Sequence, residues 1–182
     1  MPTERPGLRT DEQFEIDLRQ PGLAAFWAWL WPGAGHLYQR RYAKGILFMV
    51  CILSTYFYGL AIAGGHVVYA SWKGPEKRWQ YFCQLGVGLP ALPALVQARR
   101  DKTGGNVLFN GIMAPPKYNP YRRIDELSQW HLDYKLRFEL GTLYTMIAGL
   151  LNVLAIYDAY AGPVLIAPGA KKDEPPEASE SS

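Results

Sequence analysis

Four stretches of this chain contain no charged side chain, and they strongly restrict the fold that it can adopt. They cover residues 20–39, 45–72, 79–98 and 140–157, and the charged residues gather in the segments between them. A helix needs about 20 mainly apolar residues to cross the hydrocarbon core of a bilayer. The pattern therefore predicts an all-α fold, an integral membrane helical bundle of about four transmembrane helices.

We expect these helices at 23–38, 43–64, 79–98 and 140–161, within one transmembrane domain over 21–163. The composition alone would not show this, because 49% hydrophobic residues also suits a soluble domain of 182 residues.

Polar segments flank this domain on both sides. The leader over 1–20 lacks the basic and apolar regions of a cleavable signal peptide. The tail over 164–182 has the composition of a disordered segment. Cys51 and Cys83 lie inside charge-free stretches, so we expect two apolar thiols and no disulfide.

The turn between the first two expected helices carries Arg40, Arg41 and Lys44 and no acidic residue. Short loops rich in Lys and Arg stay on the cytoplasmic side of a membrane, so these three residues are predicted to set the topology. With four crossings, both termini lie on the opposite side from this turn. The sequence therefore predicts that both termini are outside the cytoplasm.

Glycine and proline interrupt two of the expected helices. Pro32 and Gly33 predict a kink or a break in the first, because proline removes a backbone donor and glycine loosens the turn. The third contains two glycines and two prolines between residues 86 and 93, which predicts a bend if it crosses the membrane. The alternative is a re-entrant segment, which would reverse the orientation of the fourth helix.

The polar segment over 99–139 contains an amphipathic pattern. Its second half has five apolar or aromatic side chains at helical spacing: Ile124, Leu127, Trp130, Tyr134 and Phe138. We expect an interfacial amphipathic helix over 120–138 that lies in the membrane surface and runs into the helix at 140–161.

The fourth expected helix has a stripe of small and polar residues along one side. Seven residues fall within an arc of roughly 120° at 100° per residue: Gly141, Thr145, Ala148, Gly149, Asn152, Ala155 and Ala159. In lipid, small residues allow helices to pack closely, and Asn152 can hydrogen-bond across the contact. The stripe is therefore predicted to be the helix-packing face.

Two titratable residues near the helix ends are candidate functional polar groups. Asp158 lies near the exit of the fourth helix, and an intramembrane carboxylate is a functional hypothesis by default. The competing interpretation is that Asp158 is solvated or paired structurally. His36, at the charged end of the first helix, is either a proton carrier or ligand or a hydrogen-bonded structural histidine.

The sequence favours a non-catalytic role. It has no nucleophile–base constellation and no paired metal ligands, so we expect no enzyme, no cofactor and no metal. The net charge of +3 comes without any nucleic-acid-binding motif, so nucleic acid is not an expected partner. The expected partners are the lipid bilayer and either another membrane protein or a second copy of the chain. The first hypothesis is a scaffold, assembly factor or subunit in a bacterial cytoplasmic membrane.

The alternative is a small transporter or proton-coupled channel that uses Asp158 and Asn152. Four helices of this size offer limited interior for a substrate, which ranks the scaffold first.

Two parts of the chain resemble known families. Residues 32–38 and 44–46 read Pro-Gly-Ala-Gly-His-Leu-Tyr and Lys-Gly-Ile, which resembles the helical hairpin of the TM-two domain. Residues 148–152 and 156–160 read Ala-Gly-Leu-Leu-Asn and Ile-Tyr-Asp-Ala-Tyr, which is similar to a bacterial domain-of-unknown-function family with the same hairpin. The resemblance implies a small multi-pass membrane protein, and the second family has no assigned activity to transfer.

Overall fold

A computed structural model describes residues 20–72, 77–106, 108–117 and 126–162. In chain order the elements are α1 (Pro21–Leu30), α2 (Ala34–Tyr38), α3 (Tyr42–Ile62), α4 (Gln80–Leu85), η1 (Leu89–Ala91), α5 (Leu92–Lys102), η2 (Phe109–Gly111), α6 (Glu126–Tyr134) and α7 (Leu136–Ala161). These ranges contain helices and no strand, so the prediction of an all-α fold is confirmed. The leader predicted over 1–20, apart from Gln20, and the tail predicted over 164–182 lie outside the described residues.

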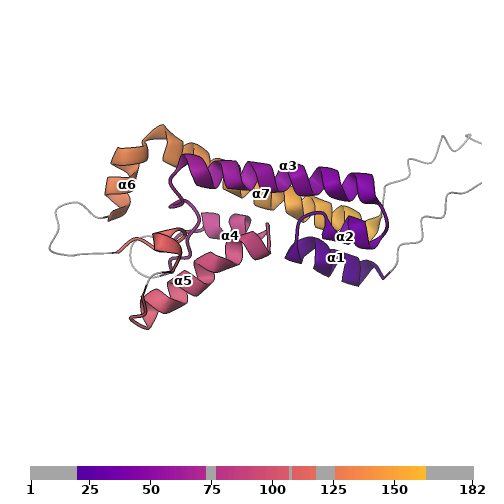
Figure 1. Ribbon diagram of the computed structural model, residues 1–182, viewed down its shortest axis with the longest axis horizontal. Coiled ribbons are helices and arrows are strands. Elements are labelled where there is room, and N and C mark those ends of the chain that lie inside the picture. Colours follow the sequence, from indigo (N-terminus) through magenta and orange to yellow (C-terminus); the bar gives the residue numbers. More distant parts are fainter. Residues whose placement is uncertain (1–19, 73–76, 107, 118–125, 163–182) are drawn as a thin grey trace, which may run out of the picture.

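Two long antiparallel helices, α3 and α7, form the centre of the molecule (Figure 1). They approach closely because Gly59 of α3 faces Gly141 of α7, where an added Cβ at Gly141 would lie 2.5 Å from the Gly59 carbonyl oxygen. Within the described ranges these are the two helices long and apolar enough to cross a membrane.

Both long helices expose large apolar side chains, and α7 buries polar ones. Only 22% of the most apolar stretch of α3 is buried, and 39% of that of α7. Large apolar residues such as Leu47 and Leu154 are exposed, at 58% and 65%. Asn152 and Thr145 are fully buried. This distribution is opposite to that of a core helix in a soluble protein.

The first charge-free stretch forms a helical hairpin instead of one continuous helix over 23–38. Residue Trp31 is extended, Gly33 has φ 82°, and α2 runs back alongside α1 (Figure 1). The break therefore falls at the Pro-Gly pair where the sequence predicts it. Its consequence is a reversal of the chain, because α1 and α2 are antiparallel neighbours.

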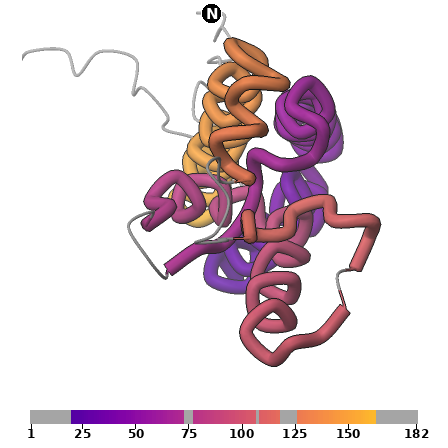
Figure 2. The backbone as a smooth tube through the Cα atoms, turned by 90° about the vertical axis from the view of Figure 1, so that its left-hand side faces the viewer, coloured from indigo at the N-terminus to yellow at the C-terminus, as the bar shows by residue number. Residues whose placement is uncertain are grey.

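The third charge-free stretch also forms a hairpin, and this corrects the expectation of one helix over 79–98. Helix α4 runs toward the middle of the α3–α7 pair, and α5 returns toward the end from which α4 came (Figure 1). The physical cause is the tip, where Gly88 has φ 85° and ψ −130°, a conformation that strongly favours glycine, and Pro90 follows. This is the shape of the re-entrant alternative. Figure 2 shows α5 directed away from α3 and α7.

The chain thus repeats one order of elements. The hairpin α1–α2 precedes the long helix α3, and the hairpin α4–α5 precedes the long helix α7, with α6 between. The two hairpins approach from opposite ends of the α3–α7 pair, and their tips meet near its middle (Figure 1). At the meeting point Gly88 lies so close to the Trp29 carbonyl oxygen that a Cβ would overlap it.

The amphipathic helix expected over 120–138 is shorter and separate in the structure. The helix α6 covers Glu126–Tyr134, and residues 118–125 lie outside the described ranges. Lys135, with φ 46°, interrupts the helix, and α7 begins at Leu136, before the expected start at residue 140. Trp130 of α6 stacks on His66 at a ring distance of 4.5 Å, which seats α6 on the loop that follows α3.

The topology expected from four crossings is wrong. The start of α1, the turn before α3 and the end of α7 all lie at the same end of the α3–α7 pair (Figure 1). A 2.7 Å contact between Lys44 and Asp158 requires this, whereas four crossings would put the two residues on opposite sides. The reason is that both hairpins reverse direction, so neither runs from one end of the α3–α7 pair to the other.

Candidate functional site

A charged cluster at this end of the molecule brings together both candidate polar residues of the sequence. The Asp158 Oδ2 atom lies 2.7 Å from His36 Nε2, 2.7 Å from Lys44 Nζ and 3.4 Å from Arg41 Nη2. A single carboxylate oxygen therefore faces three donors from two other elements and the turn between them. We call these four residues the Asp158 cluster.

Helix geometry explains why the carboxylate is tolerated there. Asp158 lies in the last turn of α7, where the helix dipole disfavours a negative charge. The same carboxylate also faces Lys44 in the first turn of α3, and the positive end of the α3 dipole favours a negative charge there. Next to it, Gln39 Nε2 donates to the Ala159 carbonyl oxygen at 2.7 Å, one of the carbonyls at the end of α7 without a helical donor.

Burial makes His36 a neutral partner in the cluster. Its side chain is fully buried, and the Phe48 ring packs against it edge-on at 5.0 Å. His36 lies in α2, outside the two long helices, and burial lowers its pKa, which outweighs the opposing effect of Asp158. The neutral imidazole donates from Nε2 to the carboxylate. Arg41 and Lys44 then face one negative charge.

A second polar site lies at the meeting point of the two hairpins. Asn152 is fully buried, and its Nδ2 donates to the Ala28 carbonyl oxygen at 3.1 Å and to the Gly86 carbonyl oxygen at 2.9 Å. In a helix these carbonyls would accept from the residues four positions later, which are Pro32 and Pro90. Proline has no N–H, so one carboxamide supplies the donor that both hairpin tips lack.

A third polar cluster is centred on Arg78, before α4. Its guanidinium donates to the Tyr69 hydroxyl and the Val67 carbonyl oxygen, both at 2.9 Å, and to Thr142 Oγ1 at 3.1 Å. Nearby, Gln84 Nε2 donates to Thr145 Oγ1 at 2.9 Å. These bonds tie the loop after α3 and the helix α4 to α7.

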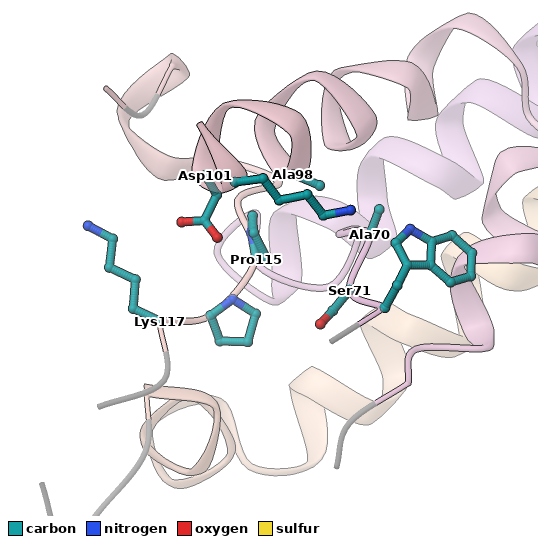
Figure 3. Close-up of a pocket in the computed structure, with 9 residues that line it drawn as sticks. Ala70, Ser71, Ala98, Asp101, Pro115 and Lys117 are labelled. Atoms are coloured by element: carbon teal, nitrogen blue, oxygen red, sulfur yellow. The ribbon is translucent and has the colours of Figure 1, made fainter. Parts of the chain in front are cut away.

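Surface pockets lie at the opposite end from the Asp158 cluster. One of about 510 Å³ is formed by residues 70–72, the end of α5 and residues 115–117. Figure 3 shows Asp101 and Lys117 on one side of this pocket and Ser71 on the other. Within the described ranges, no group of three His, Cys, Asp or Glu side chains is arranged to hold a metal ion.

The structure places the residues predicted from the sequence in three kinds of position: buried helix contacts, the Asp158 cluster and the exposed surface. All seven residues of the predicted packing stripe are buried, at the contacts of α7 with α1, α3 and α4. The cluster unites His36, Asp158, Arg41 and Lys44, while Arg40 is exposed.

Sequence reasoning missed Gln39, Gln84 and Arg78. The two glutamines stand out as amides inside or at the edge of charge-free stretches, a usable signal, whereas Arg78 lies in a polar connection and carries none.

The fold and these contacts define a class of protein: an all-helical protein with two helices long and apolar enough to cross a membrane and two hairpins packed against them. A family model described as "Family of unknown function (DUF6677)" matches residues 23–172, and the chain belongs to this family. The expected membership of a family of unknown function is confirmed in this form, and the resemblance to the TM-two domain stays a prediction. No curated protein and no solved structure matches the chain.

Proposed function

We propose that this protein is an integral membrane protein of a bacterial cytoplasmic membrane with a non-catalytic role, acting through helix packing as a scaffold, assembly factor or subunit. One observation carries the proposal: α3 and α7 expose large apolar side chains along their length, while α7 buries the polar side chains of Thr145 and Asn152 inside the molecule. Water makes such a surface unfavourable, since contiguous exposed apolar patches on soluble proteins rarely exceed a few hundred Å². Hydrocarbon makes it favourable.

The polar side chains support the non-catalytic part of the proposal. Asp158 and Asn152 both bond groups of this chain itself, and they join helices that are distant in sequence. Residues used in this way hold the fold together. A protein of this kind presents its outer apolar surface to lipid and to other membrane helices.

Membrane insertion is tested by fractionating cells that express the protein and washing the membranes at alkaline pH. The protein should stay in the pellet and dissolve only in detergent. Replacing Leu150, exposed near the centre of α7, by Arg should reduce insertion, since Arg at a helix centre costs about 2.5–3.5 kcal/mol on insertion scales. Replacing Leu132 of α6 is the matched control. Wild-type protein that dissolves in buffer alone would refute the proposal.

The packing role is tested by chemical crosslinking in membranes followed by purification in mild detergent. We expect a stable complex with a second membrane protein or a second copy of the chain. A protein that is monomeric and without partner under these conditions contradicts the role as scaffold or subunit.

Two crossings suggest a revised orientation. The short basic turn with Arg40, Arg41 and Lys44 then lies on the same side as both termini, which the positive-inside rule places in the cytoplasm. The basic residues in the long segment between α3 and α7 count little toward this orientation, since the rule applies to loops of up to about 60 residues. Single cysteines at residues 40 and 103, in a chain without Cys51 and Cys83, should label from opposite sides of the membrane. Labelling from the same side contradicts the two-crossing topology.

A specific observation also favours the second candidate, a small transporter or proton-coupled channel. Two hairpins that enter from opposite ends and meet beside a buried carboxamide resemble the broken helices and inverted repeats of secondary transporters. Ion or proton flux into proteoliposomes tests it, with Asp158→Asn as the variant and Asp101→Asn as the control. Wild-type flux equal to that of empty liposomes, or flux unchanged in Asp158→Asn, refutes this candidate.

A further inference from the structure

We propose that the end of the molecule that carries the Asp158 cluster binds the headgroup phosphate of an anionic phospholipid through Arg40 and Arg41. The inference rests on the proposed membrane location. It adds the chemical class of a lipid partner and a defined place for it.

The charges of the cluster are unbalanced. Arg40, Arg41 and Lys44 provide three positive charges, and Asp158 provides one negative charge, with His36 neutral. Lys44 makes the short contact to the carboxylate at 2.7 Å, so it takes most of the neutralisation. Arg41 is at 3.4 Å, and Arg40 is exposed. Two positive charges therefore remain for an external anion.

The guanidinium of Arg41 has spare donors that need an acceptor. Its Nη1 atom is buried, and among the described residues no group accepts a hydrogen bond from it. The Nη2 atom shares Asp158 Oδ2 with two closer donors, His36 and Lys44. A guanidinium pairs well with phosphate oxygens, and the Arg41 side chain is 16% exposed, so a headgroup oxygen that reaches this exposed part would supply an acceptor that the guanidinium lacks.

The surroundings are those of the headgroup layer. Three tyrosines are exposed at the same ends of the long helices: Tyr42 at the start of α3, and Tyr157 and Tyr160 in the last turns of α7. Tyrosine is enriched where a membrane helix leaves the hydrocarbon. Arg40 and Arg41 directly precede α3, so the proposed membrane location puts them at the level of the headgroups. A lipid anion is therefore favoured over a soluble one.

The experiment uses the full chain in neutral detergent and measures the binding of phosphatidylglycerol and of phosphatidylcholine by native mass spectrometry. We expect phosphatidylglycerol to bind more tightly. The Arg40→Asn variant removes a charge and suits the left-handed conformation at φ 61°. It should bind phosphatidylglycerol about fivefold more weakly, and the double variant with Arg41→Gln about 25-fold.

The control for the double variant removes two positive charges at the other end of the molecule, with Arg99→Asn and Lys102→Gln. It should bind phosphatidylglycerol as tightly as the wild type does. Equal affinity for the two lipids, or an equal loss in the control, would overturn the inference. Inorganic phosphate that competes at the lipid's own concentration would show a site for free phosphate, which also overturns it. All these outcomes are read on a detergent-soluble protein, so they are distinct from failure of membrane insertion.

Discussion

Replacing Asn152 by leucine tests how the two hairpins are joined. The side chain volume is nearly kept, but both N–H donors to the Ala28 and Gly86 carbonyl oxygens are lost. Neither carbonyl has its usual helical donor, because prolines follow four residues later. Hydrogen bonds between membrane helices average about 0.6 kcal/mol each, and an unsatisfied buried acceptor costs about 1–3 kcal/mol. We therefore expect a loss of about 2 kcal/mol, or about 30-fold in the unfolding equilibrium.

The assay is reversible unfolding in mixed detergent micelles, followed by tryptophan fluorescence. The Asn152→Asp variant keeps the size but replaces the amide nitrogen by a second oxygen, and a carboxylate cannot donate to the two carbonyls, so it should be at least as destabilised as the leucine variant. Val153→Leu, an apolar change at the next, exposed position, is the control and should unfold like the wild type. A leucine variant as stable as the wild type would refute the reasoning.

Three further predictions concern other contacts of the fold. Asp158→Asn should destabilise the protein by about 1 kcal/mol, because the pair is partly exposed, and the difference should shrink at high salt in the same unfolding assay. Gly149→Ala should cost about 1–3 kcal/mol, since its Cβ would overlap the Cys83 carbonyl oxygen; an unchanged melting temperature would contradict this. Burial lowers the pKa of His66, against a smaller opposing effect of Glu126, so its neutral form stabilises the fold. Stability should be complete above the ordinary pKa of 6.5 and should decrease as the pH falls below it, and His66→Phe should reduce this dependence to the part that comes from His36.

Local patterns predicted several features of the structure well. Charge-free stretches located the helical segments, and the period of small residues predicted the side of α7 that is buried, since both depend on neighbours along the chain. Pro32 and Gly33 marked the first break for the same reason. The start of α7 at Leu136 was missed, because Arg137 and Glu139 lie in its first turn and lengthen the helix beyond its apolar part.

The path of the chain after each break depended on the tertiary structure. A proline predicts that a helix is interrupted, but whether the next segment continues forward or turns back depends on what it packs against. Here α2 packs on α1 and α3, and the tip after α4 is held by Asn152. Because of these reversals, only α3 and α7 among the described residues are long enough to cross a membrane, and the basic turn lies at the same end of this pair as the start of α1 and the end of α7.

The sequence by itself determined the residue types of the candidate site, and the tertiary structure decided their association. His36 and Asp158 are distant in sequence, so no spacing rule relates them, and each was a separate candidate. The antiparallel packing of α3 and α7 brings the last turn of one helix to the first turn of the other, where opposite charges and opposite helix dipoles attract. The cluster exists because long-range packing, which local sequence does not encode, places these two helix ends side by side.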